Sequence, residues 1–273
     1  MTTTDRSQLG RPNEYPSHYS PDLLFAIPRA ETRDALDIGR AQPFHGRDVW
    51  HAFELTWLDS NGKPAIATAR IVVDANSPNL VESKSLKLYL NSLAMERYAS
   101  AEDVRRLVAS DLGNAAGDGV SVEIFVGPQP DGAAVGDLPG RCIDDLEIDA
   151  VYDGVDASVI KTAGDDVVAE TLHSHLLRSN CPVTNQPDIG SVLIRYEGTR
   201  IDAASLLAYI VSYRSHSGFH EACVERMFVD LKKRARPGKL TVHAHFNRRG
   251  GLDINPFRSD FEPLPDDIRL WRQ

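Results

Sequence analysis

The hydrophobic pattern of the chain changes at Glu82–Leu93, ESKSLKLYLNSL. Upstream of this segment apolar residues recur at every second position, whereas inside it they recur at helical spacing. The apolar positions that share one helical stripe are Leu86, Tyr89, Leu90 and Leu93. Such a stripe is typical of an amphipathic helix that packs on a neighbouring layer. The segment therefore predicts a helix that begins at Glu82 and follows a set of strands.

The residues that lead to this helix predict two antiparallel strands. Val49–Leu58 alternates between apolar and polar positions, which is the strand period. The residues expected on one face of this strand are Val49, His51, Phe53, Leu55 and Trp57. Asp59–Gly62 (DSNG) is a hairpin turn signal, and the β-branched segment Ile66–Asp74 is expected to supply the partner strand.

A second helix and a further strand are expected to complete this half. Ser100 suits the N-cap of the helix, and Gly117 suits its end. The inward positions expected for this helix are Val104, Leu107, Val108 and Leu112. Val120–Val126 then has the composition of a strand.

The second half of the chain begins after a connector rich in Gly, Pro and Asp, at residues 128–165. One short strand, Leu146–Val151, is expected inside this connector. Beyond it, strands are expected at Ser191–Tyr196, Leu206–Tyr213 and Leu240–Phe246, and a helix at Glu221–Lys233. The inward positions expected for that helix are Val224, Met227, Phe228 and Leu231.

The two halves share one pattern. Each has two strands, a polar loop, a helix that opens with a glutamate (Glu82 or Glu221), and a return to strand. Both helices carry an aromatic residue at the eighth position, Tyr89 and Phe228. The pattern indicates duplication of an antiparallel ββ-helix-β unit and predicts an α+β fold, with helices on one face of each sheet. The expected divisions are an N-terminal extended arm over 1–45, modules over 46–127 and 166–273, and the connector over 128–165.

The composition is that of an ordinary globular protein. Of the 273 residues, 42% are hydrophobic and 25% charged, and the formal net charge is −9. This charge argues against a general nucleic-acid-binding protein, which would need a basic face. The three cysteines (Cys142, Cys181 and Cys223) are far apart, so we expect reduced thiols and a cytoplasmic protein. We expect no signal peptide and no membrane span, because no apolar segment suits either.

Cys181 lies in the proline-bounded segment Ser179–Asp188, SNCPVTNQPD. Pro182 and Pro187 exclude a helix interior, and Pro182 favours an extended conformation at Cys181. We therefore expect an irregular loop here. A thiol near a carboxylate, Asp188, could attack an electrophilic carbon. The alternative is a small buried cysteine followed by a turn-forming aspartate.

Two segments carry groups suited to phosphate. At the start of the first helix, free N–H groups lie beside Ser83, Lys84 and Lys87. Arg248–Gly251 combines two guanidinium groups with backbone that can approach a ligand closely. The alternatives are a capped helix with a basic face and a turn at the end of a strand.

His220 and Glu221 open the second helix. A glutamate there could accept two parallel hydrogen bonds from the edge of a guanine-like ring. An imidazole there could donate a proton or orient a ligand. The alternatives are a favourable charge in the first turn of a helix and a surface histidine.

Metal and dinucleotide motifs receive less support. His243 and His245 share one face of a strand, and the other candidates are His173, His175, His216 and His220. No CxxC or HExxH spacing supplies further ligands, so we expect no metal. No GxGxxG follows a strand, which argues against a Rossmann site.

Several blocks of sequence follow one another in order and together resemble one family. They are ESKSLKLY at Glu82–Tyr89, LHSHLL at Leu172–Leu177, SNCP and TNQPD within Ser179–Asp188, FHE at Phe219–Glu221, and RRGGLDINP at Arg248–Pro256, with YSPDLL at Tyr19–Leu24. These blocks resemble the 7-cyano-7-deazaguanine reductase (QueF) family of nitrile oxidoreductases. The length suits its two-module subgroup, and the connector over 128–165 shows the least correspondence.

The resemblance implies tandem tunnelling-fold (T-fold) modules, whose barrel is closed by oligomerisation, most simply in a homodimer. It implies NADPH-dependent, four-electron reduction of the nitrile of 7-cyano-7-deazaguanine to 7-aminomethyl-7-deazaguanine, in the biosynthesis of the tRNA nucleoside queuosine. The reaction would pass through a cysteine thioimide and use two NADPH per turnover. The implied partner is a small deazapurine, with no direct contact to nucleic acid or a membrane.

The resemblance also implies roles for particular residues. Cys181 would be the nucleophile and Asp188 the proton donor, with His220 as a further catalytic group. The residues implied to bind the substrate are Val81, Glu82, Ser83, His220 and Glu221. Those implied to bind NADPH are Ser83, Lys84, Arg249 and Gly250.

Three other interpretations remain open from the residues. One is a zinc-dependent, GTP-cyclohydrolase-like enzyme of the same fold. Another is a nitrile-hydrolysing cysteine enzyme, and the third is a non-catalytic module that binds a purine or pterin. Metal content, NADPH consumption and a covalent adduct would separate them.

Overall fold

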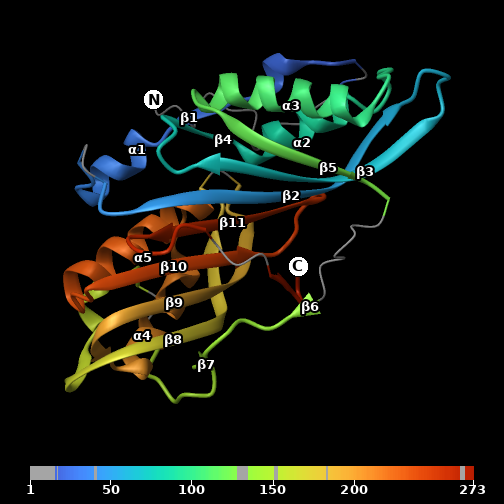
Figure 1. Cartoon of the computed structure of the whole chain (residues 1–273). Coiled ribbons are helices and arrows are strands. Elements are labelled where there is room, and N and C mark those ends of the chain that lie inside the picture. Colours follow the sequence, from blue (N-terminus) through green and yellow to red (C-terminus); the bar gives the residue numbers. More distant parts are fainter. Residues whose placement is uncertain are drawn as a thin grey trace. The chain divides into compact units, whose positions relative to one another are not determined.

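The computed structural model describes residues 16, 18–39, 42–127, 135–150, 153–182, 184–264 and 268–273. It divides into two compact units (Figure 1). Unit 1 is made of Met1–Ala35, Asp48–Ala133 and Arg248–Ile254, and unit 2 of Leu36–Arg47, Ala134–Asn247 and Asn255–Gln273. Each unit combines helices with a largely antiparallel sheet, so the predicted α+β class is confirmed. Parts of the predicted arm and connector (1–15, 17, 40–41, 128–134 and 151–152) lie outside the described residues.

The sheet of unit 1 has the strand order β5-β3-β2. These strands are β2 (His45–Leu58), β3 (Pro64–Asp74) and β5 (Val120–Val126). Helices α2 (Ser83–Ser92) and α3 (Ala101–Ala116) cover one face of the sheet, as Figure 1 shows, and enclose an apolar core with it. The order β2, β3, α2, α3, β5 confirms the pattern predicted for this half.

The turns and caps of unit 1 follow the sequence signals closely. The backbone N–H of Gly62 donates to the Asp59 carbonyl (2.9 Å), and Gly62 has the positive φ of +86° that its turn requires. The Ser100 hydroxyl accepts from the backbone N–H of Asp103 at the start of α3. Gly117 ends α3 in the left-handed conformation. The predicted hairpin and both helix boundaries are therefore confirmed.

The predicted face of β2 is only partly right. Leu55 and Trp57 are buried in the core of unit 1, whereas His51 and Phe53 are only half-buried. Trp50 and Ala52 occupy the core positions in their place. The core-facing residues change parity between Ala52 and Leu55, which is the effect that one extra residue in a strand produces.

The N-terminal arm is not a plain extended segment. It contains short turns of helix at Pro21–Leu23 (η2), Ala30–Arg33 (α1) and Asp34–Leu36 (η3). Its strand β1 (Ala26–Pro28) pairs antiparallel with β4 (Asn79–Val81). The Arg29 side chain is buried and donates to Asp48 over 2.6 Å. The polar composition did not indicate this, because the charge of Arg29 is paired with that of Asp48 inside unit 1.

The sheet of unit 2 has the strand order β11-β10-β9-β8-β7. These strands are β7 (Arg141–Cys142), β8 (Thr162–Asn180), β9 (Pro187–Ile201), β10 (Lys239–Phe246) and β11 (Leu252–Ser259, in unit 2 from Asn255). Neighbours are antiparallel except β7, which is parallel to β8. Helices α4 (Ala203–Ser212) and α5 (His220–Arg234) pack against the core of this sheet. The remaining elements are β6 (Val135–Gly136), β12 (Arg269–Leu270), η4 (Ala157–Val159) and η5 (Tyr213–Ser215).

The strand predicted at Leu206–Tyr213 is wrong, because this segment forms most of helix α4. A short apolar run fits a buried strand and a buried helix equally well. The deciding contact is local: the Asp202 carboxylate accepts from the backbone N–H of Ser205 (2.8 Å) and caps the helix.

The connector and the strands around it also differ from the prediction. No strand forms at the described residues 146–150, whereas β7 and the long β8 were missed. The prediction also lacks β11, because the repeated pattern is expected to end at the glycine-rich segment that precedes this strand. The structure confirms the strand predicted at Leu240–Phe246 and the helix predicted from Glu221. The four residues expected to point inward from this helix are buried.

The internal repeat is present, but its helices correspond differently from the prediction. Among the described residues, each unit has two helices of ten residues or more, α2 and α3 in unit 1 and α4 and α5 in unit 2, so α2 corresponds to α4 rather than to α5. The Tyr89 hydroxyl donates to Asp111 over 2.6 Å in unit 1, and the Tyr209 hydroxyl donates to Asp230 over 2.6 Å in unit 2. The counterpart of the Glu82 cap is therefore Asp202, and Glu221 opens the second helix of its unit.

We expect Tyr209→Phe to lower the free energy of unfolding by about 1.5–3 kcal/mol. The variant leaves the Asp230 carboxylate without the hydroxyl donor, and a hydrogen bond to a charged group contributes about this amount. Urea denaturation measures the change. Tyr98→Phe is the control, because this tyrosine is less buried, and it should change stability by less than about 0.5 kcal/mol.

Candidate functional site

Cys181 lies in unit 2, in the short irregular segment between β8 and β9, as predicted. Its backbone N–H donates to the Gln186 carbonyl (2.9 Å), and its carbonyl accepts from the backbone N–H of Asn185 (3.0 Å). Asn185 takes a left-handed conformation, with φ of +53°, which an asparagine tolerates. The loop therefore has a defined turn, and its thiol is half-buried.

The same loop is fastened to the segment that precedes α5. The backbone N–H of Asn180 donates to the His216 carbonyl (2.8 Å), and the backbone N–H of Gly218 donates to the Asn180 carbonyl (3.0 Å). These two bonds join the end of β8 to the residues before His220. The nucleophile candidate and the start of α5 therefore belong to one hydrogen-bonded framework.

Asp188 and His220 form a pair in unit 2. Asp188 is 2% exposed at the start of β9, and its Oδ1 lies 3.3 Å from Nε2 of His220. The His220 ring packs edge-on against Phe246, with centroids 4.3 Å apart. Glu221, the next residue of α5, is 3% exposed. This arrangement can hold a proton at a carboxyl and orient it with an imidazole.

The three thiols differ in their surroundings. Cys223 is fully buried in α5, and burial raises the pKa of its thiol to about 12. Burial also raises the pKa of the Cys142 thiol. Because the thiolate is the nucleophile, the buried Cys223 is a poor candidate for covalent chemistry.

In unit 1, Glu82 caps helix α2. Its Oε1 accepts from the backbone N–H of Lys84 (2.7 Å) and its Oε2 from that of Ser85 (2.8 Å). Burial raises the pKa of this carboxyl, while the two backbone bonds and the lysines nearby oppose the rise. A carboxylate has about four acceptor positions, so capping leaves room for a ligand. The candidates Val81, Ser83 and Lys84 flank this cap.

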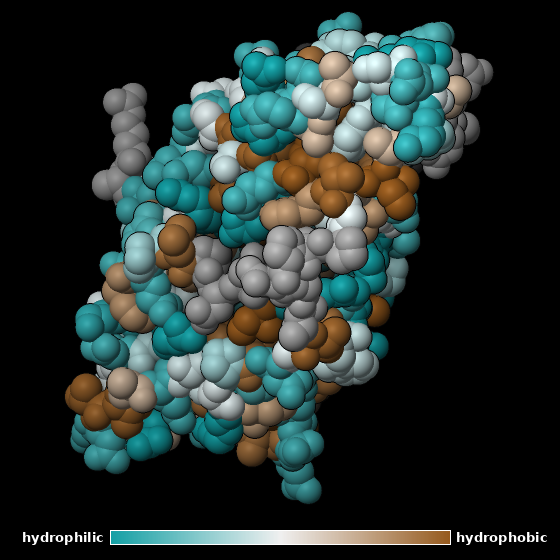
Figure 2. All heavy atoms as spheres, turned by 45° about the vertical axis from the view of Figure 1, so that its right-hand side comes forward, coloured by the Kyte–Doolittle hydropathy of each residue, from teal (hydrophilic) through white to brown (hydrophobic). Residues whose placement is uncertain are grey.

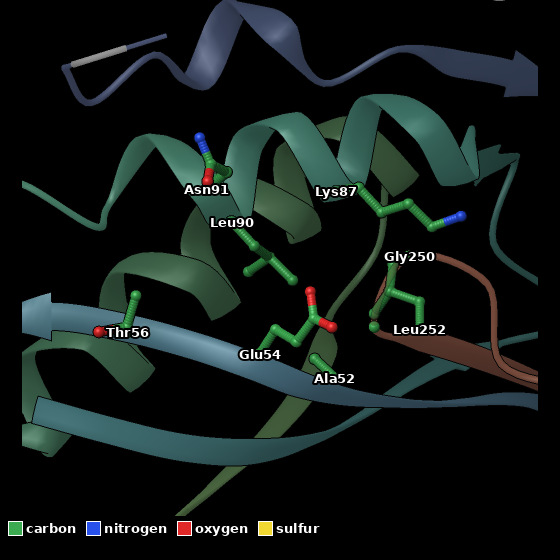
Figure 3. Close-up of a pocket in the computed structure, with 9 residues that line it drawn as sticks. Ala52, Glu54, Thr56, Lys87, Leu90, Asn91, Gly250 and Leu252 are labelled. Carbon is green, nitrogen blue, oxygen red and sulfur yellow. The ribbon is translucent and has the colours of Figure 1, made fainter. Parts of the chain in front are cut away.

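A pocket in unit 1 of about 70 Å³ lies between α2, β2 and the turn before β11 (Figure 3). Its lining residues are Ala52, Glu54, Thr56, Lys87, Leu90, Asn91, Gly250, Gly251 and Leu252. Gly250 and Gly251 both have positive φ, and a Cβ on Gly251 would lie 2.7 Å from the Glu54 Cδ. The turn therefore needs glycine here, and this explains the motif Arg248–Gly251 in local terms.

The pocket brings one predicted residue, Gly250, close to Lys87, whose side chain lies beside it in Figure 3. Glu54 was not singled out from the sequence, because an exposed glutamate in a strand carries no signal. The Arg248 guanidinium stacks over the Phe53 ring at 4.3 Å. Arg249 lies far from α2 in the sequence. The fold places both segments in unit 1.

Two histidine groups bear on metal binding. The rings of His243 and His245 lie 4.1 Å apart, and burial holds the pKa of His243 well below its usual range. Within the described ranges, one group of three potential ligands is found, and it consists of Cys142, His173 and His175 in unit 2. His216 and His220 do not belong to this group. The sequence offered no sign that Cys142 would join His173 and His175.

Comparisons with known proteins match the chain in two segments and over its full length. A family model described as nitrile reductase, 7-cyano-7-deazaguanine-reductase N-term, matches residues 15–124, and one described as QueF-like protein matches residues 187–263. The NADPH-dependent 7-cyano-7-deazaguanine reductase of Paraburkholderia phymatum is 49% identical over 273 residues, covering 99% of this chain and 100% of that protein.

Two further relatives carry the same name. That of Chromohalobacter salexigens is 50% identical (99% of this chain, 98% of that protein), and that of Burkholderia multivorans is 49% identical (98% and 99%). A crystal structure of the archaeosine synthase QueF-Like in the apo form matches with 17% identity and a TM-score of 0.31, over 36% of this chain and 95% of that one. With near-complete coverage at about half identity, the chain belongs to the QueF family of NADPH-dependent 7-cyano-7-deazaguanine reductases.

Proposed function

We propose that this chain reduces the nitrile of 7-cyano-7-deazaguanine to 7-aminomethyl-7-deazaguanine with NADPH, as a step towards queuosine. The full-length similarity to reductases of that name supports the substrate and the cofactor. The observation that carries the proposal is the Cys181 loop, joined by backbone hydrogen bonds to the segment before His220, whose ring pairs with Asp188. A thiol and a buried carboxyl are the two groups that thioimide chemistry needs.

The proposed steps balance in atoms and electrons. The Cys181 thiolate adds to the nitrile carbon while Asp188 delivers a proton to the nitrogen, which gives a thioimide. A hydride from the first NADPH adds to the same carbon, and collapse of this adduct expels the thiolate and leaves an imine. A hydride from the second NADPH and a proton give the amine. Each turnover consumes one nitrile, two NADPH and two protons.

In this proposal His220 positions the Asp188 carboxylate and also contacts the substrate. Its Nε2 lies within 3.3 Å of the Asp188 carboxylate, so it can hold that group in place and return a proton to it. Glu221 would accept hydrogen bonds from the guanine-like edge, and Val81, Glu82 and Ser83 would add further substrate contacts. For NADPH we propose Ser83, Lys84, Arg249 and Gly250. We propose no metal in the reaction.

We further propose that the 46–127 and 166–273 segments are T-fold modules, linked by 128–165, and that the chain forms a homodimer. Strand β5 lies at the edge of its sheet, and an edge strand favours association. Ile66 and Val126 are 74% and 62% exposed on the adjacent strands β3 and β5, and Figure 2 shows apolar side chains gathered on the face in view. An apolar edge of this kind suits a second copy of the chain.

We also place the reaction in the cytoplasm, where three free cysteines remain reduced. Within the described residues, no helix is both long and apolar enough to cross a membrane. The ligand we propose is the free deazapurine, without direct contact to nucleic acid.

The test is the stoichiometry of the reaction with purified protein. We expect two NADPH oxidised per amine formed, and a mass increase equal to the whole nitrile when NADPH is left out. Formation of an acid without NADPH consumption would support a nitrile-hydrolysing enzyme instead. Reversible binding of the nitrile without a covalent adduct would support a purine-binding module. Enzyme activity that disappears when a chelator removes metal ions would support the zinc-dependent, GTP-cyclohydrolase-like enzyme.

A further inference from the structure

Three potential metal ligands of unit 2 converge on neighbouring strands. His173 and His175 lie two residues apart on β8, and Cys142 lies on β7 in register with His173. One ligand atom from each of the three lies within 4.8 Å of the others. A Cβ on Gly140 would lie 2.2 Å from the Thr171 carbonyl oxygen, so this glycine lets the chain enter β7 close beside β8.

Both imidazoles are oriented through the ring nitrogen that a metal would not use. Nδ1 of His173 lies 3.1 Å from the Pro139 carbonyl, and only a protonated Nδ1 can donate to it. Nδ1 of His175 lies 2.8 Å from the Ser191 hydroxyl. The Pro139 carbonyl therefore fixes the tautomer of His173 and leaves its Nε2 with a lone pair for a metal. The Ser191 hydroxyl, which can accept as well as donate, orients the His175 ring.

The backbone around His175 departs from a regular ladder. The register between β8 and β9 shifts between Ser174 and Leu177, so His175 lies in an irregular stretch of the strand. Bulges re-aim side chains near sites. The Asp144 carboxylate accepts from the backbone N–H of His175 (3.0 Å) and interacts with the Cys142 thiol, so it holds both strands together and adds negative charge. Arg272 donates to the His175 carbonyl, and its positive charge opposes the negative charge of Asp144.

We propose that Cys142, His173 and His175 bind a borderline divalent transition-metal ion, with Zn²⁺ as the principal ligand. One thiolate and two imidazoles are donors that Zn²⁺ prefers, and a water completes four ligands. In a tetrahedral zinc site the ligand atoms lie about 3.5 Å apart. A shift of about 1 Å closes the cluster, and Cys142 can supply it because it is exposed on a two-residue edge strand.

The ion would fasten β7 to β8, and it lies apart from the proposed reaction. Asn180, which ends β8 beside Cys181, lies five residues beyond His175, or roughly 16 Å along a strand. β7 pairs with β8 through two residues, so a metal crosslink would add much to its attachment. Metal binding should therefore raise the unfolding temperature without being needed for the nitrile chemistry.

Cobalt provides the sharpest test, because Co²⁺ replaces Zn²⁺ and reports thiolate ligation as a charge-transfer absorption band. The full chain is freed of metal and titrated with Co²⁺, and then with Zn²⁺ in competition. We expect one ion per chain, a thiolate-to-cobalt band that Zn²⁺ abolishes, and release of about one proton, from the thiol. An unaltered protein without this band overturns the proposal.

Variants locate the ion. Cys142→Ser should abolish the band, and His173→Gln should weaken Zn²⁺ binding by about 100-fold or more. Ser191→Ala removes an outer partner and should weaken it by about 10-fold. His18→Gln, an exposed histidine of unit 1, and Cys181→Ser should leave binding unchanged. A band that survives Cys142→Ser, or that is lost in Cys181→Ser, contradicts the assignment.

Discussion

Replacement of Cys181 by alanine should abolish the covalent adduct and lower the turnover number by on the order of 10⁴-fold or more. Without the thiolate, the nitrile carbon has no nucleophile that turns it into an acceptor of hydride. The measurements are the intact mass with 7-cyano-7-deazaguanine in the absence of NADPH, and the rate of NADPH oxidation. The substrate should still bind reversibly, because the variant keeps Asp188, His220 and Glu221.

The matched control for this variant is Cys223→Ala, which removes the other thiol of the region. Cys223 is fully buried, and the pKa of its thiol is raised to about 12, so it should contribute no nucleophile. This variant should form the adduct with the same mass increase as the unaltered chain. An adduct that persists in Cys181→Ala but disappears in Cys223→Ala would show that Cys223, and not Cys181, is the nucleophile.

The sequence predicted those parts of the fold that depend on local signals. The hairpin at Asp59–Gly62, helix α2 and helix α3 have caps, turn residues or long periodic stripes, and all three are confirmed. Leu206–Tyr213 was wrong because a short apolar run carries no period that separates helix from strand. The shift of parity in β2 was equally invisible, because one extra residue leaves no mark in the composition.

The candidate site shows the same division between local and long-range information. Cys181 could be found because Pro182 and Pro187, which both follow it, exclude a helix interior and place it in a loop. The approach of His220 to Asp188 depends on backbone bonds between the end of β8 and the segment before α5. The cluster of Cys142, His173 and His175 depends on the pairing of β7 with β8, a parallel contact between segments that no turn connects directly. Long-range pairing of this kind leaves no periodic signal in one sequence.

Glu225→Ala should lower the free energy of unfolding by about 3–5 kcal/mol. Glu225 in α5 and Arg258 in β11 are 2% and 0% exposed within unit 2. Nε and Nη2 of Arg258 donate to Oε1 of Glu225 over 3.0 and 2.8 Å. Removal of the carboxylate takes away the charged acceptor of two hydrogen bonds from this buried guanidinium, whose other contacts include the Phe257 carbonyl (2.9 Å) and the Phe44 ring. Urea denaturation followed by circular dichroism measures the loss.

The double variant Glu225→Leu with Arg258→Met tests whether the stability lost in Glu225→Ala is due to the guanidinium charge of Arg258. Apolar residues of similar volume often replace a buried ion pair at little cost, so most of the stability should return. Arg105 and Glu102 in α3 provide the exposed comparison, because they are joined by two bonds of 2.7 Å that solvent screens. Glu102→Ala should therefore change little. A double variant as unstable as Glu225→Ala would show that packing around these side chains, rather than their charge, stabilises the core of unit 2.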